Sequence, residues 1–182
     1  MEAAVRILSR GARDLTTNRV ADMAGVSIGS LYQYFPDKQA IFGALLDRHV
    51  QQSTAALERT FAARRTSTLP ELLGDLFTVS VQAHSAKPAL YQFLASQAAG
   101  DLAVSRAHAA CLQNGLRAAL EREGHAPADA EGIAFVLSRQ LDTLTHGVIL
   151  DLPPTLPREL AEAEALRALT GYLTTCVARA AP

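Results

Sequence analysis

Hydrophobic positions recur at intervals of three and four residues along nearly the whole chain, which places them on one face of an α-helix. This spacing predicts nine helices, over residues 2–9, 17–24, 28–35, 38–64, 69–85, 89–98, 102–122, 127–150 and 158–179. No stretch shows the alternation of apolar and polar residues between turn signals that is typical of a strand. The predicted fold class is therefore all-α.

The predicted helices divide into two domains that share one long helix. The first domain is expected over residues 1–46, and the second over residues 47–182. The helix that begins at Lys38 starts in the first domain and continues to about residue 64, where a polar stretch meets Pro70. Such a helix links the motions of the two domains.

Within the first domain, two short helices are joined by a tight turn. Thr17 is expected to cap the first helix, and Gly25 to end it, because a helix end favours a residue with positive φ. Val26 is expected to fill the corner between the helices, and Ser27 to cap the second, which covers residues 28–35. A turn of this length that contains glycine predicts a helix-turn-helix, whose second helix enters the DNA major groove. An ordinary αα-corner is the competing interpretation.

The second of these helices has a divided surface. Leu31 and Phe35 lie four residues apart and are expected to pack inward. The remaining positions are left for DNA: Gly29 permits close approach, and Ser30 and Gln33 carry donors and acceptors for base edges. Polar side chains nearby can bind phosphate oxygens, which fix register.

The run TTNRVADMAGVSIGSLYQYFPDK, at residues 16–38, resembles the DNA-binding signature of the TetR/AcrR family of transcriptional regulators. This resemblance implies an all-helical homodimer whose variable C-terminal domain binds a small inducer. It implies phosphate contacts by Thr17, Tyr34 and Lys38, and groove contacts by the exposed face of the second helix. The predicted DNA-binding residues are Thr17, Ser27, Ile28, Gly29, Ser30, Tyr32, Gln33, Tyr34 and Lys38. The family's first helix usually starts earlier, often with basic residues, so such an arm is absent here or lies outside this sequence.

Composition narrows the class of protein. The 182 residues are 49% hydrophobic, which argues against a disordered chain. No run approaches the roughly 20 apolar residues of a membrane span, and no signal peptide is recognisable, so a cytoplasmic protein is expected. Residues 1–65 hold nine Lys and Arg against six Asp and Glu, a slightly basic balance that suits a DNA-facing end. The two cysteines, at 111 and 176, are expected to be packing residues.

A candidate ligand site lies in the second domain. Arg139, Asp142 and His146 are spaced by three and four residues and so share one helix face, where they either line a pocket or form an ion-pair network. His84 and His108 are either pocket residues or partly exposed surface. An apolar cavity with a few convergent polar groups is typical of small-molecule sites. The predicted lining is Phe77, Val81, His84, Tyr91, Phe93, His108, Cys111, Leu112, Phe135, Arg139, Asp142 and His146. We expect an apolar or aromatic inducer.

The last two helices carry apolar side chains in excess of what a small monomer covers. By the resemblance, this pair from each subunit forms a four-helix dimer interface, with Leu141, Leu144, Val148, Leu166, Leu169 and Leu173. A symmetric dimer reads a palindromic operator with half-sites about 34–36 Å apart. We find no catalytic motif, no metal site and no cofactor motif, so an enzyme is not expected. By the resemblance, the expected function is a ligand-released repressor. The alternative is a helical small-molecule or metal-sensing module in which DNA binding is secondary.

Overall fold

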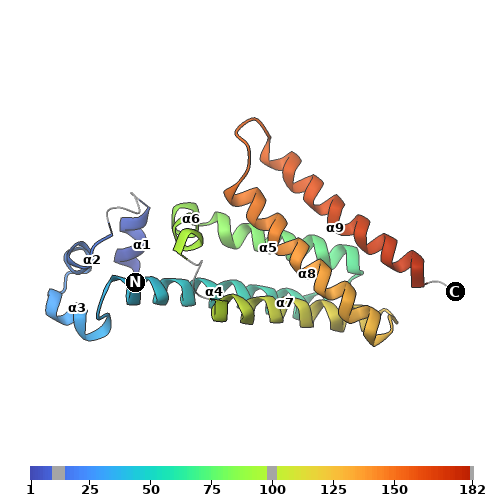
Figure 1. Cartoon of the computed structure of the whole chain (residues 1–182), viewed down its shortest axis with the longest axis horizontal. Coiled ribbons are helices and arrows are strands. Elements are labelled where there is room, and N and C mark those ends of the chain that lie inside the picture. Colours follow the sequence, from blue (N-terminus) through green and yellow to red (C-terminus); the bar gives the residue numbers. More distant parts are fainter. Residues whose placement is uncertain (10–14, 98–101, 181–182) are drawn as a thin grey trace.

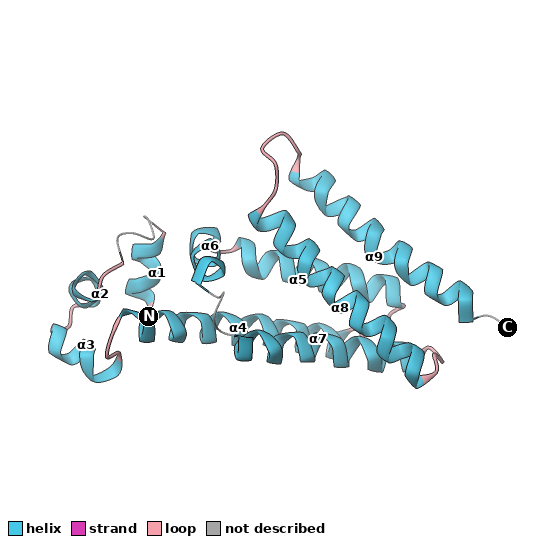
Figure 2. Ribbon diagram, in the orientation of Figure 1, coloured by secondary structure: helices cyan, strands magenta, loops and turns pink. Residues whose placement is uncertain are grey.

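A computed structural model describes residues 1–9, 15–97 and 102–180 of the chain (Figures 1 and 2). The fold is all-α, and the described residues form helices without strands, as predicted. The helices are α1 (Glu2–Leu8), α2 (Thr17–Ala24), α3 (Ile28–Tyr34), α4 (Lys38–Ala63), α5 (Leu69–Ser85), α6 (Pro88–Gln97), α7 (Leu102–Arg122), α8 (Pro127–Leu150) and α9 (Arg158–Ala180).

Helix ends follow local capping chemistry. The Asp37 side chain accepts from the backbone N–H of Ala40 at 2.8 Å, which fixes the start of α4. Thr68 and Glu71 form a capping box at the start of α5. Several predicted boundaries shift by one residue, among them the end of α1, at Leu8, and the start of α6, at Pro88. Helix α3 ends at Tyr34, because Phe35 turns to an extended conformation and packs half-buried against the neighbouring helices. The expected ends at Gly11 and Gly100 and the expected cap at Asp101 lie outside the described residues.

Two hydrophobic cores organise the chain. The head core joins α1, α2 and α3 to the first turns of α4, with Ile7, Leu31 and Ile41 among its buried members. The body core is formed by the far end of α4 with α5, α7, α8 and α9. Helix α4 spans both, and α7 packs along it (Figure 1). The head is therefore attached to the body by one continuous helix.

Helix α6 packs in the head core and also contacts α5 of the body. Phe93 and Leu94 are buried in the head core, where the Phe93 ring meets the Phe42 ring edge-on at 4.6 Å between centroids. Tyr91, on another side of the same helix, faces the body. Figure 1 shows α6 between α1 and α5, above α4. This short helix is the second physical link between head and body.

The apolar stripe of α8 and α9 is largely used inside the protomer. Leu141, Val148, Leu169 and Leu173 are 7% exposed or less and sit in the body core, and Leu144 and Leu166 are half-buried. Four of the six leucine and valine side chains expected at a dimer interface are thus already covered. Among the described residues of these helices, Phe135 on α8 and Leu160 on α9 are the large apolar side chains left exposed, at 53% and 47%. No helix in the described ranges is both long enough and apolar enough to cross a membrane.

Candidate nucleic-acid interface and ligand site

The turn between α2 and α3 has the predicted geometry with one change of cap. Thr16, rather than Thr17, caps α2, since its side chain accepts from the backbone N–H of Arg19 at 3.2 Å. Gly25 takes the left-handed conformation, φ 69°, that ends the helix. Ser27 caps α3 by accepting from the N–H of Ser30 at 3.0 Å. Both helices are therefore fixed by their own side chains at the turn.

Thr17 takes a different role from the expected cap. Its hydroxyl lies 3.3 Å from the hydroxyl of Tyr32 on α3, so the two side chains tie α2 to α3. Val26, expected to fill the corner, is 45% exposed, because the turn carries its side chain away from the core. The corner is held instead by backbone: the N–H of Val26 donates to the carbonyl of Ala21 at 3.1 Å.

Helix α3 presents almost its whole surface to solvent. Leu31 is its one buried residue, at 6% exposure, and anchors the helix on the head core. Tyr34 is 78% exposed, and Gln33 is also exposed. At Gly29 an added Cβ would approach only the Ser27 hydroxyl, at 3.8 Å, so the outer face of this turn is open. An exposed, capped helix with one anchoring residue has the geometry needed for insertion in a groove.

The remaining predicted DNA contacts flank this helix. Lys38 opens α4, and its ammonium group lies 5.1 Å from the centre of the Phe42 ring, a cation–π contact that directs the long side chain. Ile28 is 37% exposed at the N-terminus of α3, and the Ser30 hydroxyl bonds the Ser27 hydroxyl at 2.9 Å. All nine predicted residues thus lie on α2, α3, the cap between them or the start of α4, and none is buried.

A second site lies in the body, where aromatic rings from four helices meet. His49 of α4, His84 of α5, Tyr91 of α6 and His146 of α8 form a ring cluster with centroid separations between 4.2 and 5.8 Å. His108 of α7 lies beside it and bonds the Thr54 hydroxyl through Nδ1 at 3.1 Å. Four of the five histidines in the chain therefore gather in one region.

Burial favours the neutral form of three of these imidazoles, those of His49, His84 and His108. The pKa of His84 falls from 6.5 to about 4, chiefly because burial removes water from its charged form, with neighbouring imidazoles adding to the effect. Burial also lowers the pKa of His49 and of His108, although the Asp142 carboxylate partly offsets the effect at His108. The pKa of the Tyr91 hydroxyl is raised by burial and by Asp142. His49, His84 and His108 thus offer uncharged polar groups at neutral pH.

The structure assembles part of the predicted ligand set. His84, Tyr91, His108, Asp142 and His146 converge, with His146 Nδ1 at 3.8 Å from an Asp142 oxygen. Other predicted lining residues lie elsewhere: Phe77, Val81 and Leu112 are in the body core with Cys111 beside them, Phe93 is in the head core, and Phe135 and Arg139 are exposed.

Sequence reasoning missed His49, Ser53 and Thr54, which face the ring cluster from α4. The signal was present, since polar residues interrupt an apolar face of the long helix at those positions. Within the described part of the chain, no group of three or more His, Cys, Asp or Glu side chains is arranged to hold a metal ion.

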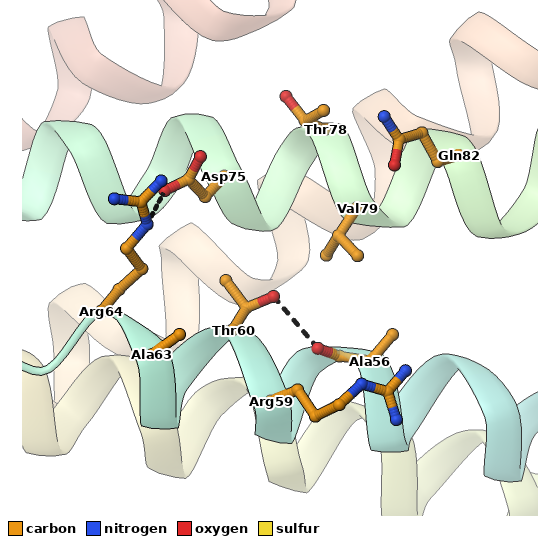
Figure 3. A pocket seen from close by; sticks show the side chains of 9 residues that line it. All are labelled: Ala56, Arg59, Thr60, Ala63, Arg64, Asp75, Thr78, Val79 and Gln82. Atoms are coloured by element: carbon orange, nitrogen blue, oxygen red, sulfur yellow. Dashed lines mark hydrogen bonds and ion pairs between the residues drawn. The ribbon is translucent and has the colours of Figure 1, made fainter.

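Among the described residues, three of the hollows that border the body helices have a defined lining. A groove of about 380 Å³ lies between α4 and α5, where Thr60 and Val79 face each other and Arg64 pairs with Asp75 at 2.5 Å (Figure 3). Another, of about 400 Å³, separates α5 from α9. The third is a small cavity of about 90 Å³ among α1, α4, α5 and α6, and it borders the ring cluster at His84 and Tyr91.

Both the N-terminal and the C-terminal part of the chain match known protein families. Residues 1–45 match the description "Bacterial regulatory proteins, tetR family", and residues 68–173 match "Tetracyclin repressor-like, C-terminal domain". The nucleoid occlusion factor SlmA of Haemophilus ducreyi is 36% identical over 70 residues, which is 38% of this chain and 34% of that protein. The match thus spans about a third of the length of this relative.

Solved structures share the fold over most of the chain. A transcriptional regulator from Rhodococcus sp. Rha1 superposes with a TM-score of 0.74 at 23% identity, covering 96% of this chain and 94% of that chain. The multidrug binding protein EbrR, solved in complex with imidazole, gives a TM-score of 0.56 at 26% identity, covering 94% and 90% of the two chains. The arrangement of head and body is therefore shared with these proteins.

Proposed function

The chain belongs to the tetR family of bacterial regulatory proteins, and on that premise we propose that it represses transcription as a ligand-responsive homodimer. Each protomer presents one α3 helix to a half-site of a palindromic operator. The observation that carries the proposal is the exposed, capped α3 helix with its single anchoring residue, Leu31. Two such helices related by a twofold axis match two half-sites about 34–36 Å apart.

Release of DNA depends on the link between the ligand site and the head. Tyr91 of α6 lies in the ring cluster, whereas Phe93 and Leu94 of the same helix lie in the head core. A ligand that displaces Tyr91 moves a helix on which the head is packed. It shifts the equilibrium between operator-competent and released states only by its differential affinity for the two. A small molecule bound beside the ring cluster therefore acts on the orientation of α3. The imidazole complex of EbrR is consistent with a small polar ligand in this fold.

The test is fluorescence anisotropy of the purified full chain on labelled duplex DNA. Fragments of the neighbouring promoter region are compared with a scrambled duplex across a salt series. A regulator binds both in a steeply salt-dependent manner and binds the operator about a thousandfold more tightly than the scrambled duplex. Absence of any salt-dependent binding, with the chain folded, contradicts the proposal and favours a helical small-molecule module.

A further inference from the structure

The small cavity of about 90 Å³ lies where head and body meet. Val5 reaches it from α1, Leu45 and Arg48 from α4, and His84 from α5, and α6 adds Tyr91. Its volume corresponds to a few water-sized positions, which suits a compact molecule of few atoms. An occupant here touches the DNA-binding head and the ring cluster at once.

The lining of this cavity carries positive charge without negative charge. Arg48 and Lys87 are exposed cations on its lining, and no carboxylate side chain lines it. In the part of the chain that the structure describes, no ion pair neutralises either cation. The nearest acidic group to the ring cluster is Asp142, which lies on the α8 side, beside His146 and His108. The cavity is therefore positive at its solvent edge.

The inner wall combines apolar surface with a buried acceptor. Leu45 is 2% exposed, and Val5 is half-buried. His84 is 7% exposed, and its Nδ1 lies 2.6 Å from the carbonyl oxygen of Ser80. A carbonyl only accepts, so Nδ1 carries the proton, and Nε2 of the neutral ring holds a lone pair. Protonation at Nε2 turns this buried acceptor into a charged donor.

We propose that this cavity binds a short-chain monocarboxylate, with the carboxylate between Arg48 and Lys87 and the alkyl chain against Val5, Leu45 and Leu90. The inference rests on the proposed function in one respect, since it names the chemical class of the inducer. Charge-assisted hydrogen bonds from guanidinium and ammonium groups favour a carboxylate over its neutral isosteres. The apolar wall favours an alkyl acid over inorganic phosphate, which has no apolar surface to bury.

Binding is linked to proton uptake. The titratable groups that face His84 are His49 on α4, Tyr91 on α6, His108 on α7 and His146 on α8. Arg48 and Lys87 line the same cavity, and Asp142 lies beside His108 and His146. A bound carboxylate brings a negative charge to a region whose imidazoles are held neutral, and so favours their protonation. The affinity is therefore expected to be higher at about pH 6 than at about pH 8.

The experiment is isothermal titration of the full chain with butyrate, butyramide and inorganic phosphate at matched ionic strength, at about pH 6 and about pH 8. Butyrate is expected to bind, more tightly at the lower pH, and butyramide and phosphate are expected to bind at least about tenfold more weakly. Arg48→Gln and Lys87→Gln each weaken butyrate by about tenfold. Arg59→Gln is the matched control, because Arg59 is exposed on the same helix but lines the groove between α4 and α5.

Each other outcome overturns the proposal. If butyramide binds as tightly as butyrate, the site does not recognise the negative charge. If phosphate binds more tightly than butyrate, the ligand is not a carboxylate. If Arg59→Gln lowers the affinity for butyrate as much as Arg48→Gln does, butyrate does not bind in this cavity. Because Arg48, Lys87 and Arg59 are exposed, all three variants are expected to fold, which circular dichroism checks. DNA anisotropy with and without butyrate separates the two proposals: butyrate binding without a change in DNA affinity keeps the site and refutes its role as inducer site.

Discussion

At the scale of single residues, the proposed function divides the DNA contacts of α3 and its surroundings into contacts to phosphate, which position the protein, and contacts to base edges, which give sequence specificity. Tyr34 ends the helix and Lys38 opens the next one, and both carry groups suited to phosphate oxygens, whereas Gln33 lies exposed within the helix. Leu31 is the anchor that holds this surface on the head. The division predicts that substitutions on the two kinds of position change different measurable quantities.

Lys38→Ala is expected to weaken binding to all duplexes and to lower the salt slope by about one, because one phosphate contact is lost. Gln33→Ala is expected to cost about 1–3 kcal/mol on the operator and much less on a scrambled duplex, since it removes a base contact. Anisotropy titrations at several salt concentrations measure both. Equal losses on both duplexes for both variants contradict this division.

The buried imidazoles make stability depend on pH. The folded-state pKa of His84, about 4, is below its ordinary 6.5, so the unfolded chain binds more protons between these values. Stability is therefore complete above about pH 7 and falls as the pH drops toward 4, by up to about 3 kcal/mol from this residue. Urea unfolding at a series of pH values measures the loss. His84→Asn should flatten the profile, and His125→Gln, outside the ring cluster, should leave its slope unchanged.

At the scale of elements, helix ends were predictable and helix faces were less so. Gly25 and Ser27 mark their turn because one residue type suits each backbone position. The α2 cap was misplaced by one residue, since Thr16 and Thr17 carry the same hydroxyl chemistry. Helix α6 is apolar at Leu90, Tyr91, Phe93 and Leu94, so its periodicity does not say which side chains face the head. Only the packing of α1 against α6 decides it.

The close approach of α4 and α7 rests on one glycine. A methyl group at Gly115 would overlap the Phe61 ring, whereas one at Gly132 on α8 meets nothing within 4 Å. Gly115→Ala is expected to destabilise the chain by about 1–3 kcal/mol through overpacking. Gly132→Ala, the control, should be neutral or stabilise by up to about 1 kcal/mol, as expected for a helix interior. Thermal and urea unfolding give both values.

A double substitution tests the cause of that loss. If the overlap with Phe61 is responsible, Gly115→Ala should cost little in a Phe61→Ala background, which gives a large coupling energy in the double-mutant cycle. Additive effects of the two substitutions contradict the packing explanation. The same cycle with Gly132→Ala should show no coupling.

At the scale of the whole molecule, the apolar stripe of α8 and α9 was an ambiguous signal. A row of leucines predicts that a helix face is buried. It does not indicate whether the protomer's own core or a partner subunit buries that face. Leu141 and Leu169 proved to belong to the core, whereas Phe135 and Leu160 remain exposed. The fold could therefore be predicted from the sequence, and the surfaces left for association could not.

For the proposed dimer, Phe135→Asp is expected to raise the dissociation constant by at least about tenfold, because a charge replaces exposed apolar area at the association face. Sedimentation velocity across a concentration series measures this. Ile28→Asp in the head is the control: it should leave association unchanged and reduce operator affinity. Unchanged association of the Phe135 variant places the interface elsewhere.

The position of Tyr91 and Phe93 on one helix has a consequence for how this regulator can evolve. Two residues along α6 span roughly 3 Å of helix axis, so under the proposed function the choice of inducer and the affinity for the operator depend on neighbouring side chains. A substitution that re-tunes one is felt by the other. Lineages that acquire a new effector through this helix should therefore carry compensating changes in the α1–α6 contact, and variants selected for altered inducer response should show altered basal repression.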